Sequence, residues 1–362
     1  MTDLYAKRLM LKNFRNYKSL DMELSPHINI FRGKNAQGKT NLLEAIYYCA
    51  TGRSHRTSFD RECILYKEDE ALIKLWYERY REDQIEIHLR KNGRKSIAVN
   101  GMAARKINEL FGCFPVVVFS PEDLSLIKSG PSRRRRFMDM EICQVDPVYL
   151  FNLQQYCRIL RQRNQLLKDI YRSPGKKDEL QDWDRQLAHY GIQLVRRREQ
   201  FIETIRPMTQ TLHISISHGT EELSISYESG KADGEEEFYN RLQKDVSRDI
   251  LQGNTSFGPH HDDILLEING TDVRVYGSQG QQRTAALSLK LAEFEMMKKE
   301  IGYAPVLLLD DVMSELDGDR QLHLLKYIEE NQTILTCTGI EDSIRQLPAG
   351  RVFEIEKGNV KK

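Results

Sequence analysis

The pattern of apolar and polar residues predicts an α/β structure at both ends of the chain. Up to about residue 120, alternating runs such as 71–78 (ALIKLWYE) and 83–90 (DQIEIHLR) are typical of half-buried strands. Asn92-Gly93 is a hairpin turn signal that links the second run to 94–99 (RKSIAV). The continuous apolar run at 113–119 (CFPVVVF) indicates a strand that is buried on both faces.

The middle of the chain has a helical period instead. From Pro147 onward, apolar residues recur every three or four positions, and the period resumes after a break at 172–177 (RSPGKK), where Pro174 and Gly175 interrupt it. This pattern predicts a helical hairpin. Residues 213–227 (HISISHGTEELSISY) alternate and predict a β-hairpin, and 236–251 predicts one more helix.

The last third returns to α/β patterning. Residues 264–276 (ILLEINGTDVRVY) predict a second β-hairpin, and a long helix follows from about Gln279 to Lys299. The apolar runs within 304–311 (APVLLLDD) and 333–339 (TILTCTG) predict buried strands.

Composition adds little to this picture. The 362 residues carry a net charge of +1, which excludes a uniformly basic coat for nucleic acid. None of the six cysteines forms a CxxC pair, so they read as reduced packing residues. The start of the chain does not have the pattern of a signal peptide, and no stretch approaches the roughly 20 apolar residues of a membrane span. We therefore expect a cytoplasmic protein.

The strongest chemical motif lies at residues 33–40, which read GKNAQGKT and fit GxxxxGK[ST]. An apolar strand candidate precedes the motif and a helix candidate follows it. Glycines allow backbone N–H groups to turn inward around phosphate oxygens, and the helix N-terminus adds partial positive charge. Lys39 is expected to reach the β- and γ-phosphates, and Thr40 to ligate Mg²⁺. The predicted ATP- or GTP-binding residues are Gly33, Lys34, Asn35, Ala36, Gln37, Gly38, Lys39 and Thr40.

Two carboxylates follow the buried strand at 306–309. Asp310 is expected to hold Mg²⁺, and Asp311 to orient the attacking water. Lys39, Asp310 and Asp311 are therefore the predicted catalytic residues. Thr40 and Asp310 are 270 positions apart (310 − 40), so a large insertion separates strands that are expected to be neighbours in one sheet.

Ser278 stands at the N-cap position of the long helix, and the backbone amides of Gln279 and Gly280 follow it. Such a helix N-terminus is suited to a second phosphate contact. Taken alone, the same residues are equally compatible with an ordinary capped core helix.

Several longer segments carry a resemblance to a known family. SQGQQ (278–282) is similar to the ABC signature sequence, and SELD (314–317) to the ABC D-loop. Further matching pieces are KNFRNY (12–17), TNLLEAIY (40–47), TGRSHRT (51–57), VVFSPEDLSLIKSGPSRRRRFMD (117–139) and GPHHDDILL (258–266). Together these segments resemble the RecF family of SMC-like ABC ATPases, and they extend over nearly the whole chain.

The resemblance implies an ABC-type ATPase head of mixed sheets and helices, a largely helical second lobe and no long coiled coil. It assigns 1–125 to the first lobe, 126–285 to a helical arm that ends at the signature, and 286–362 to the remainder of the first lobe. It also implies ATP and Mg²⁺ as cofactors. Two copies would enclose ATP head to tail, with Ser278 of one copy facing the phosphate loop of the other.

The resemblance further implies a role in recombinational repair and replication. The family acts on DNA at single-strand gaps or junctions, with RecR and RecO as partners in loading RecA. Asp311 replaces the usual catalytic glutamate, and 333–339 contains no switch histidine, for which Thr336 or Thr338 is a candidate substitute. These departures favour a slow ATPase that acts as a switch, and the resemblance implies that the ATPase is weak and DNA-dependent. The alternatives are an SMC-like clamp in another DNA-processing complex, a transporter ATPase subunit and an ATP-gated nuclease.

Positive charge gathers in the middle of the chain. Residues 131–200 hold 15 Lys and Arg against 9 Asp and Glu, so the rest of the chain has a net charge of −5. Such a cluster suits contacts to DNA phosphates, although a solvated helix face has the same composition. The candidate DNA contacts are Arg53, Arg56, Lys91, Arg94, Lys95, Arg133, Arg134, Arg135 and Arg136. His260 and His261 are expected to belong to a polar turn, because no further metal ligands occur at suitable spacing.

Overall fold

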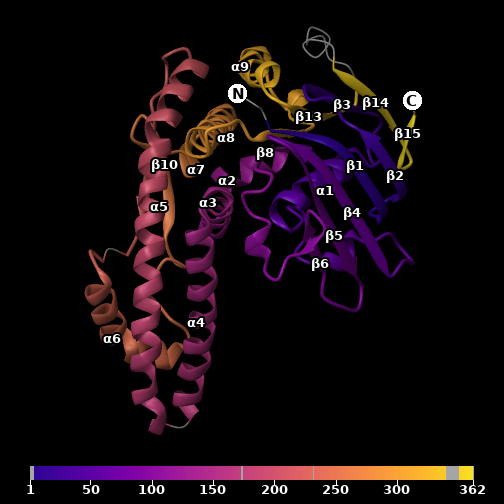
Figure 1. Ribbon diagram of the computed structural model, residues 1–362. Coiled ribbons are helices and arrows are strands. Elements are labelled where there is room, and N and C mark those ends of the chain that lie inside the picture. The colour runs from indigo at the N-terminus through magenta and orange to yellow at the C-terminus, as the bar shows by residue number, and fades with distance from the viewer. Residues whose placement is uncertain (1–3, 173, 231, 340–349, 362) are drawn as a thin grey trace. The chain divides into compact units, whose positions relative to one another are not determined.

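The computed structural model describes residues 4–172, 174–230, 232–339 and 350–361 (Figure 1). The chain forms two compact units. Unit 1 comprises 1–124, 215–218 and 286–362, and unit 2 comprises 125–214 and 219–285.

Unit 1 contains an antiparallel sheet with the strand order β2-β1-β4-β5-β6-β7. Its regular alternation of buried and half-exposed residues, clearest in β4, shows that one face is packed and the other is open. Its strands are β1 (Tyr5–Phe14), β2 (Tyr17–Glu23), β4 (Glu70–Glu78), β5 (Glu82–Arg90), β6 (Ser96–Val99) and β7 (Met102–Ala103).

The second sheet of unit 1 has the order β15-β14-β3-β13-β12-β8. Its strand pairs are parallel, except that β14 and β15 form an antiparallel hairpin. Its strands are β3 (Ile28–Arg32), β8 (Val116–Phe119), β12 (Val306–Asp310), β13 (Thr333–Cys337), β14 (Arg351–Glu356) and β15 (Asn359–Lys361). The central strands β12 and β13 are almost wholly buried, as their apolar sequences predict.

Helix α1 (Lys39–Thr51) contacts strands of both sheets of unit 1, and its buried apolar residues belong to one shared hydrophobic core. Within α8 (Gln279–Ile301), Phe294 stacks edge-on against Tyr327 of α9 (Gly318–Glu330), with ring centroids 5.4 Å apart. The short 3-10 helices η1 (Asp60–Cys63), η2 (Ile107–Glu109), η3 (Pro121–Asp123) and η5 (Met313–Glu315) complete unit 1.

Unit 2 is dominated by two long helices, α4 (Pro147–Arg172) and α5 (Leu180–Ile216), which run side by side in Figure 1. The 37 residues of α5 correspond to a length of about 55 Å. A small antiparallel sheet has the order β11-β10-β9. The other elements are α2 (Leu124–Lys128), α3 (Pro131–Val145), η4 (Pro174–Glu179), β9 (Leu223–Glu228), α6 (Glu235–Gln252), β10 (Asp263–Ile268), β11 (Thr271–Asp272) and α7 (Val273–Tyr276).

A buried ionic cluster ties three helical segments of unit 2 together. The guanidinium of Arg163 on α4 lies 2.5 Å from Asp184 on α5 and 2.8 Å from Asp249 on α6, and all three side chains are fully buried. Arg163 also donates a hydrogen bond of 2.8 Å to Thr255. Burial raises the pKa of Asp184, although the charge of Arg163 opposes the shift.

Two predicted hairpins are wrong in part. Residues 213–216 end helix α5, and β9 pairs with β10 instead of with this segment. The alternating residues at 213–216 belong to a helix, because burial here follows the helical period: Ile205, Thr209 and His213 are buried at four-residue intervals, and Ile214 is exposed. Similarly, 273–276 form the short helix α7, which begins where the Asp272 carboxylate accepts a hydrogen bond from the Arg274 N–H.

No helix in the described parts of the chain is both long enough and apolar enough to span a membrane.

We predict that Arg163→Leu lowers the free energy of unfolding by about 3–5 kcal/mol at pH 7, because it leaves the carboxylates of Asp184 and Asp249 buried without their cation. The loss should shrink as the pH falls from 7, because burial already raises the pKa of Asp184 and protonation removes its unpaired charge. Urea denaturation at both pH values measures the effect. The control is Arg161→Leu, which removes an exposed guanidinium two residues away. Equal losses in both variants would contradict the prediction.

Candidate nucleotide-binding site

The loop of residues 33–40 joins strand β3 to helix α1 at the carboxyl edge of the parallel sheet. Gly38 caps the helix with φ +111°, a backbone conformation that favours glycine. A Cβ atom at Gly38 would also lie 2.5 Å from the side-chain amide of Asn16. Ala36 has φ +63° as well, so the loop holds a residue other than glycine in the left-handed region.

Lys39 directs its ammonium group back into this loop. Its Nζ donates hydrogen bonds to the carbonyl oxygens of Gly33 at 2.5 Å and Lys34 at 3.1 Å, and the residue is buried. The positive charge is therefore held beside the loop backbone, where a phosphate group would be bound.

The structure brings Thr40 and Asp310 into direct contact across 270 positions of sequence. The Thr40 hydroxyl donates to the Asp310 carboxylate, with 2.8 Å between Oγ1 and Oδ1. Asp310 is the last residue of β12, and parallel strands in one sheet bring their carboxyl ends to the same edge. Strands β3 and β12 lie in one sheet as expected, but they are not immediate neighbours, because β13 lies between them.

The intervening strand β13 supplies Thr336, which is bonded to both acidic residues. Its Oγ1 donates to Asp310 Oδ1 at 2.8 Å and accepts from the backbone N–H of Asp311 at 2.9 Å. Thr336 is also buried. Thr336 and Thr338 are the two candidates for the role of the switch histidine, and these hydrogen bonds favour Thr336. They fix the orientation of the Asp310 carboxylate and of the peptide that follows it.

Asp311 has φ +53°, which is a strained conformation for a residue other than glycine. Its carbonyl oxygen accepts a hydrogen bond of 2.8 Å from Ser314 of the SELD segment. Burial raises the pKa of the Asp311 carboxyl, the charge of Lys39 lowers it, and the charge of Asp310 raises it, with a net increase. A carboxylate with a raised pKa is a better proton acceptor than an ordinary aspartate.

The oxygen atoms of Thr40 and Asp310 fit the ligand preference of Mg²⁺. Among the described residues, no group of three or more His, Cys, Asp and Glu side chains is arranged to hold a metal ion. Mg²⁺ often uses one or two protein ligands together with phosphate oxygens and water. The site therefore suits an ion that arrives with a nucleotide.

The predicted signature segment begins helix α8. Ser278 and Gln281 form a reciprocal cap: the Gln281 N–H donates to Ser278 Oγ at 3.2 Å, and the Ser278 N–H donates to Gln281 Oε1 at 2.8 Å. Ser278 and Gln279 are exposed, and Gly280 is half-buried. Ser278 is thus an exposed helix cap. This position is compatible both with a phosphate contact and with an ordinary capped helix.

The candidate DNA contacts of unit 1 differ in their environments. Arg53, Lys91 and Arg94 are exposed. Arg56 is exposed but donates to Asn41 Oδ1 at 2.9 Å. Lys95 forms an ion pair and a hydrogen bond, because its ammonium lies 3.0 Å from the Asp60 carboxylate and 2.7 Å from the Gly52 carbonyl oxygen. This partnership argues for a structural role of Lys95.

The arginines at 133–136 also separate into two kinds. Arg133 and Arg136 are exposed on α3. Arg134 is 3% exposed and makes a two-pronged ion pair with Asp263, at 2.6 and 2.8 Å, so its burial argues against the predicted DNA contact. Arg135 is half-buried and donates to the carbonyl oxygen of Asp262 at 2.7 Å. A helix places neighbouring side chains on different faces, which the RRRR run does not reveal.

Glu44 lies on the helix that follows the phosphate loop, and motif analysis did not single it out. Its fully buried carboxylate on α1 accepts hydrogen bonds from Arg15 and Ser54, both at 2.5 Å. Burial raises its pKa, but the hydrogen bonds from Arg15 and Ser54 and the charges of Arg15 and Arg56 together outweigh burial, so the pKa lies below its usual value. Its only sequence signal is a glutamate on the apolar helix that follows the phosphate loop.

His260 has a structural environment. Its Nδ1 lies 2.7 Å from the hydroxyl of Tyr156, its Nε2 lies 3.0 Å from the Thr255 carbonyl oxygen, and burial lowers its pKa to about 4. The imidazole is therefore neutral at physiological pH.

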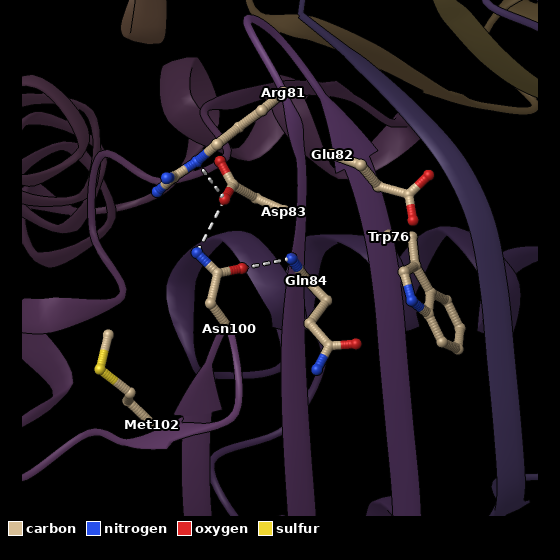
Figure 2. A pocket seen from close by; sticks show the side chains of 7 residues that line it. All are labelled: Trp76, Arg81, Glu82, Asp83, Gln84, Asn100 and Met102. Atoms are coloured by element: carbon tan, nitrogen blue, oxygen red, sulfur yellow. Dashed lines mark hydrogen bonds and ion pairs between the residues drawn. The ribbon is translucent and has the colours of Figure 1, made fainter.

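An open pocket of about 500 Å³ lies beside β5 (Figure 2). Asn100 organises its polar wall by donating to Asp83 at 2.7 Å and accepting from the Gln84 N–H at 2.8 Å. Its lining residues are Trp76, Arg81, Glu82, Asp83, Gln84, Asn100 and Met102. The pocket shares no residue with the candidate nucleotide site.

Comparison with known proteins extends over the whole length of the chain. Residues 5–342 match the family described as RecF/RecN/SMC N terminal domain. The DNA replication and repair protein RecF of Agathobacter rectalis is 48% identical over 99% of both chains. RecF of Lachnoclostridium phytofermentans is 49% identical over 99% of this chain and 100% of its own.

Solved structures agree with these relatives. A structure described as the recombination mediator protein RecF with ATP in the RecFOR pathway superposes with a TM-score of 0.93 and 39% identity, covering 99% of this chain and 98% of the other. The Smc head domain from Pyrococcus furiosus is 18% identical with a TM-score of 0.55 over 99% of this chain and 95% of its own, which shows a shared fold alone. This chain belongs to the RecF family.

Proposed function

We propose that this chain is an ATP-dependent DNA-binding protein in recombinational repair and replication. The observation that carries the proposal is the contact between Thr40 and Asp310 beside Lys39, which brings the loop of residues 33–40 and a carboxylate suited to Mg²⁺ to one sheet edge. ATP is the favoured nucleotide because RecF relatives of 39% identity are described with ATP or an ATP analogue.

In the proposed reaction, the loop amides and Lys39 would bind the phosphates, and Thr40 and Asp310 would hold Mg²⁺. The ion would neutralise charge on the phosphate oxygens. Asp311 orients the attacking water and accepts its proton, for which its raised pKa is suited. Its side chain is one methylene shorter than the glutamate usual in ABC ATPases, so we expect slow hydrolysis.

Nucleotide binding would then control the pairing of two copies on DNA. The exposed Ser278 cap can contact the phosphate bound by a second copy, and the hydrolysis of ATP would release the pair. The exposed Arg53, Arg133 and Arg136 are the better candidates for DNA phosphates, since they are not buried as Arg134 is.

The proposed place of action is a single-strand gap or a junction between single- and double-stranded DNA. There the protein would act with RecR and RecO to load RecA. Support comes from the relatives, which are described as DNA replication and repair proteins and as a recombination mediator in the RecFOR pathway.

We predict that Asp311→Asn lowers ATP hydrolysis by about 100-fold or more while ATP binding persists, because the amide cannot accept a proton. The wild-type rate should fall on acidification at a pH above the ordinary aspartate pKa of 3.8, since the raised pKa protonates the base earlier. Phosphate release across pH and calorimetric titration with ATP measure the two effects. Asp319→Asn, an exposed change on α9, serves as the control.

We predict that Thr336→Val lowers kcat for ATP hydrolysis by about tenfold with a smaller change in KM. The variant keeps the side-chain shape but removes the bonds to Asp310 and the Asp311 N–H. Thr336→Ser should restore most of the rate. The matched control is Thr333→Val on the same strand. The Thr333 hydroxyl is also buried, but it donates to the Asn331 carbonyl oxygen and not to Asp310 or Asp311. A Thr333 variant as slow as the Thr336 variant would contradict a specific role.

We predict that Ser278→Arg abolishes the ATP-dependent gain in affinity for gapped duplex DNA, because a bulky cation would block the approach of a second copy. ATP binding to the isolated chain should persist. The measurement compares DNA binding with and without a non-hydrolysable ATP analogue, with Thr271→Arg on exposed β11 as the control. If the Ser278 variant keeps the full gain, nucleotide-controlled pairing through this helix end is excluded.

A further inference from the structure

Two segments from opposite ends of the chain hold the same part of the phosphate loop. The carbonyl oxygen of Gln37 accepts a hydrogen bond of 2.9 Å from the side-chain amide of Asn16 and one of 3.1 Å from the backbone N–H of Gly358. The motif at 33–40 does not require either residue, and neither contact follows from the consensus of the loop.

Asn16 lies in the two-residue turn between β1 and β2. Its Nδ2 donates to Gln37, and its Oδ1 accepts a hydrogen bond of 2.8 Å from Asn41 on α1. The neighbouring Tyr17 hydroxyl donates to the carbonyl oxygen of Gly38 at 3.0 Å. This turn therefore bonds to two consecutive carbonyls of the loop and to the helix that follows it.

The turn between β14 and β15 closes on the loop from the other end of the sequence. The Lys357 N–H donates to Gln37 Oε1 at 2.8 Å, across 320 positions. Gly358 has φ +72°, and a Cβ atom there would lie 2.3 Å from the Asn16 carbonyl oxygen. The three segments are thus in direct contact, and only glycine leaves enough space at this position.

These bonds determine where the loop amides point. In a trans peptide, the C=O of one residue and the N–H of the next point in opposite directions, and no described peptide is cis. Holding the Gln37 carbonyl toward Asn16 and Gly358 therefore turns the Gly38 N–H the other way. Holding the Gly38 carbonyl toward Tyr17 does the same for the Lys39 N–H. Inward-pointing N–H groups are the donors that bind phosphate in such loops.

We propose that Asn16 and the Lys357–Gly358 turn form a clamp that positions the N–H groups of Gly38 and Lys39 toward the nucleotide phosphates. The clamp residues are positioning residues, because they act through the loop backbone. This inference rests on the proposed function, in which the loop binds ATP. It makes nucleotide affinity depend on a turn that begins 46 positions after Asp311 (357 − 311).

Two variants test the clamp by different routes. Asn16→Asp keeps the size of the side chain and the acceptor for Asn41, but the carboxylate cannot donate to Gln37. Gly358→Ala inserts a methyl group against the Asn16 carbonyl oxygen. Its matched control is Gly101→Ala, because Gly101 has a similar φ of +77° but no atom within 4 Å of the added Cβ. The backbone strain is therefore similar in both alanine variants, and only one perturbs the clamp.

The experiment is calorimetric titration of Mg·ATP into the full chain, with a melting temperature measured for each variant. We expect the ATP dissociation constant to rise by about tenfold in Asn16→Asp and Gly358→Ala and to stay near the wild-type value in Gly101→Ala. Asn16→Asp adds no left-handed strain, so it remains informative if Gly358→Ala proves unstable. Wild-type affinity in a folded Asn16→Asp variant overturns the clamp. Failure of the wild-type chain itself to bind ATP would overturn the proposed function instead.

Discussion

The arrangement of the candidate nucleotide site depends on the hydrogen bonds that converge on the Asp310 carboxylate. Thr40 and Thr336 both donate to the same oxygen at 2.8 Å, so the end of β12 is joined to the start of α1 and to the end of β13. These contacts require three parallel strands whose carboxyl ends lie at one edge. A core shared by the two sheets and α1 keeps that edge in place.

Charged residues have two separate uses in this chain. Buried cations such as Arg163 and Arg134 lie against carboxylates at 2.5 to 2.8 Å and hold helices or a strand together. Exposed cations such as Arg133 and Arg136 remain accessible to solvent. The second kind suits contacts to a polyanion, because a buried ion pair would lose its partner on binding one. The high arginine content of the middle segment therefore overstates its capacity to bind DNA.

The proposed clamp orients the peptide groups of the phosphate loop through their carbonyl oxygens. A loop that binds phosphate through backbone N–H groups needs its carbonyl oxygens bonded elsewhere, since each peptide plane carries both groups. Asn16, Tyr17 and Gly358 provide those bonds to Gln37 and Gly38. The binding surface is thereby organised before a ligand arrives, which reduces the cost of ordering it.

The sequence by itself determined the local elements of this protein and most of the candidate site. The phosphate loop, the strand ending in Asp310 and the cap at Ser278 depend on adjacent residues, whose spacing is visible in the chain. The alternation of apolar and polar residues at 213–216 predicted a strand, but these residues end helix α5, because a run of four residues is too short to distinguish the two periods. Only the tertiary structure decided that β13 separates β3 from β12, that Arg134 is buried, and that Gly358 meets Asn16. The physical reason is that these outcomes come from contacts between separate segments, such as Asn16 with Gly358 and Arg134 with Asp263, which no local periodicity encodes.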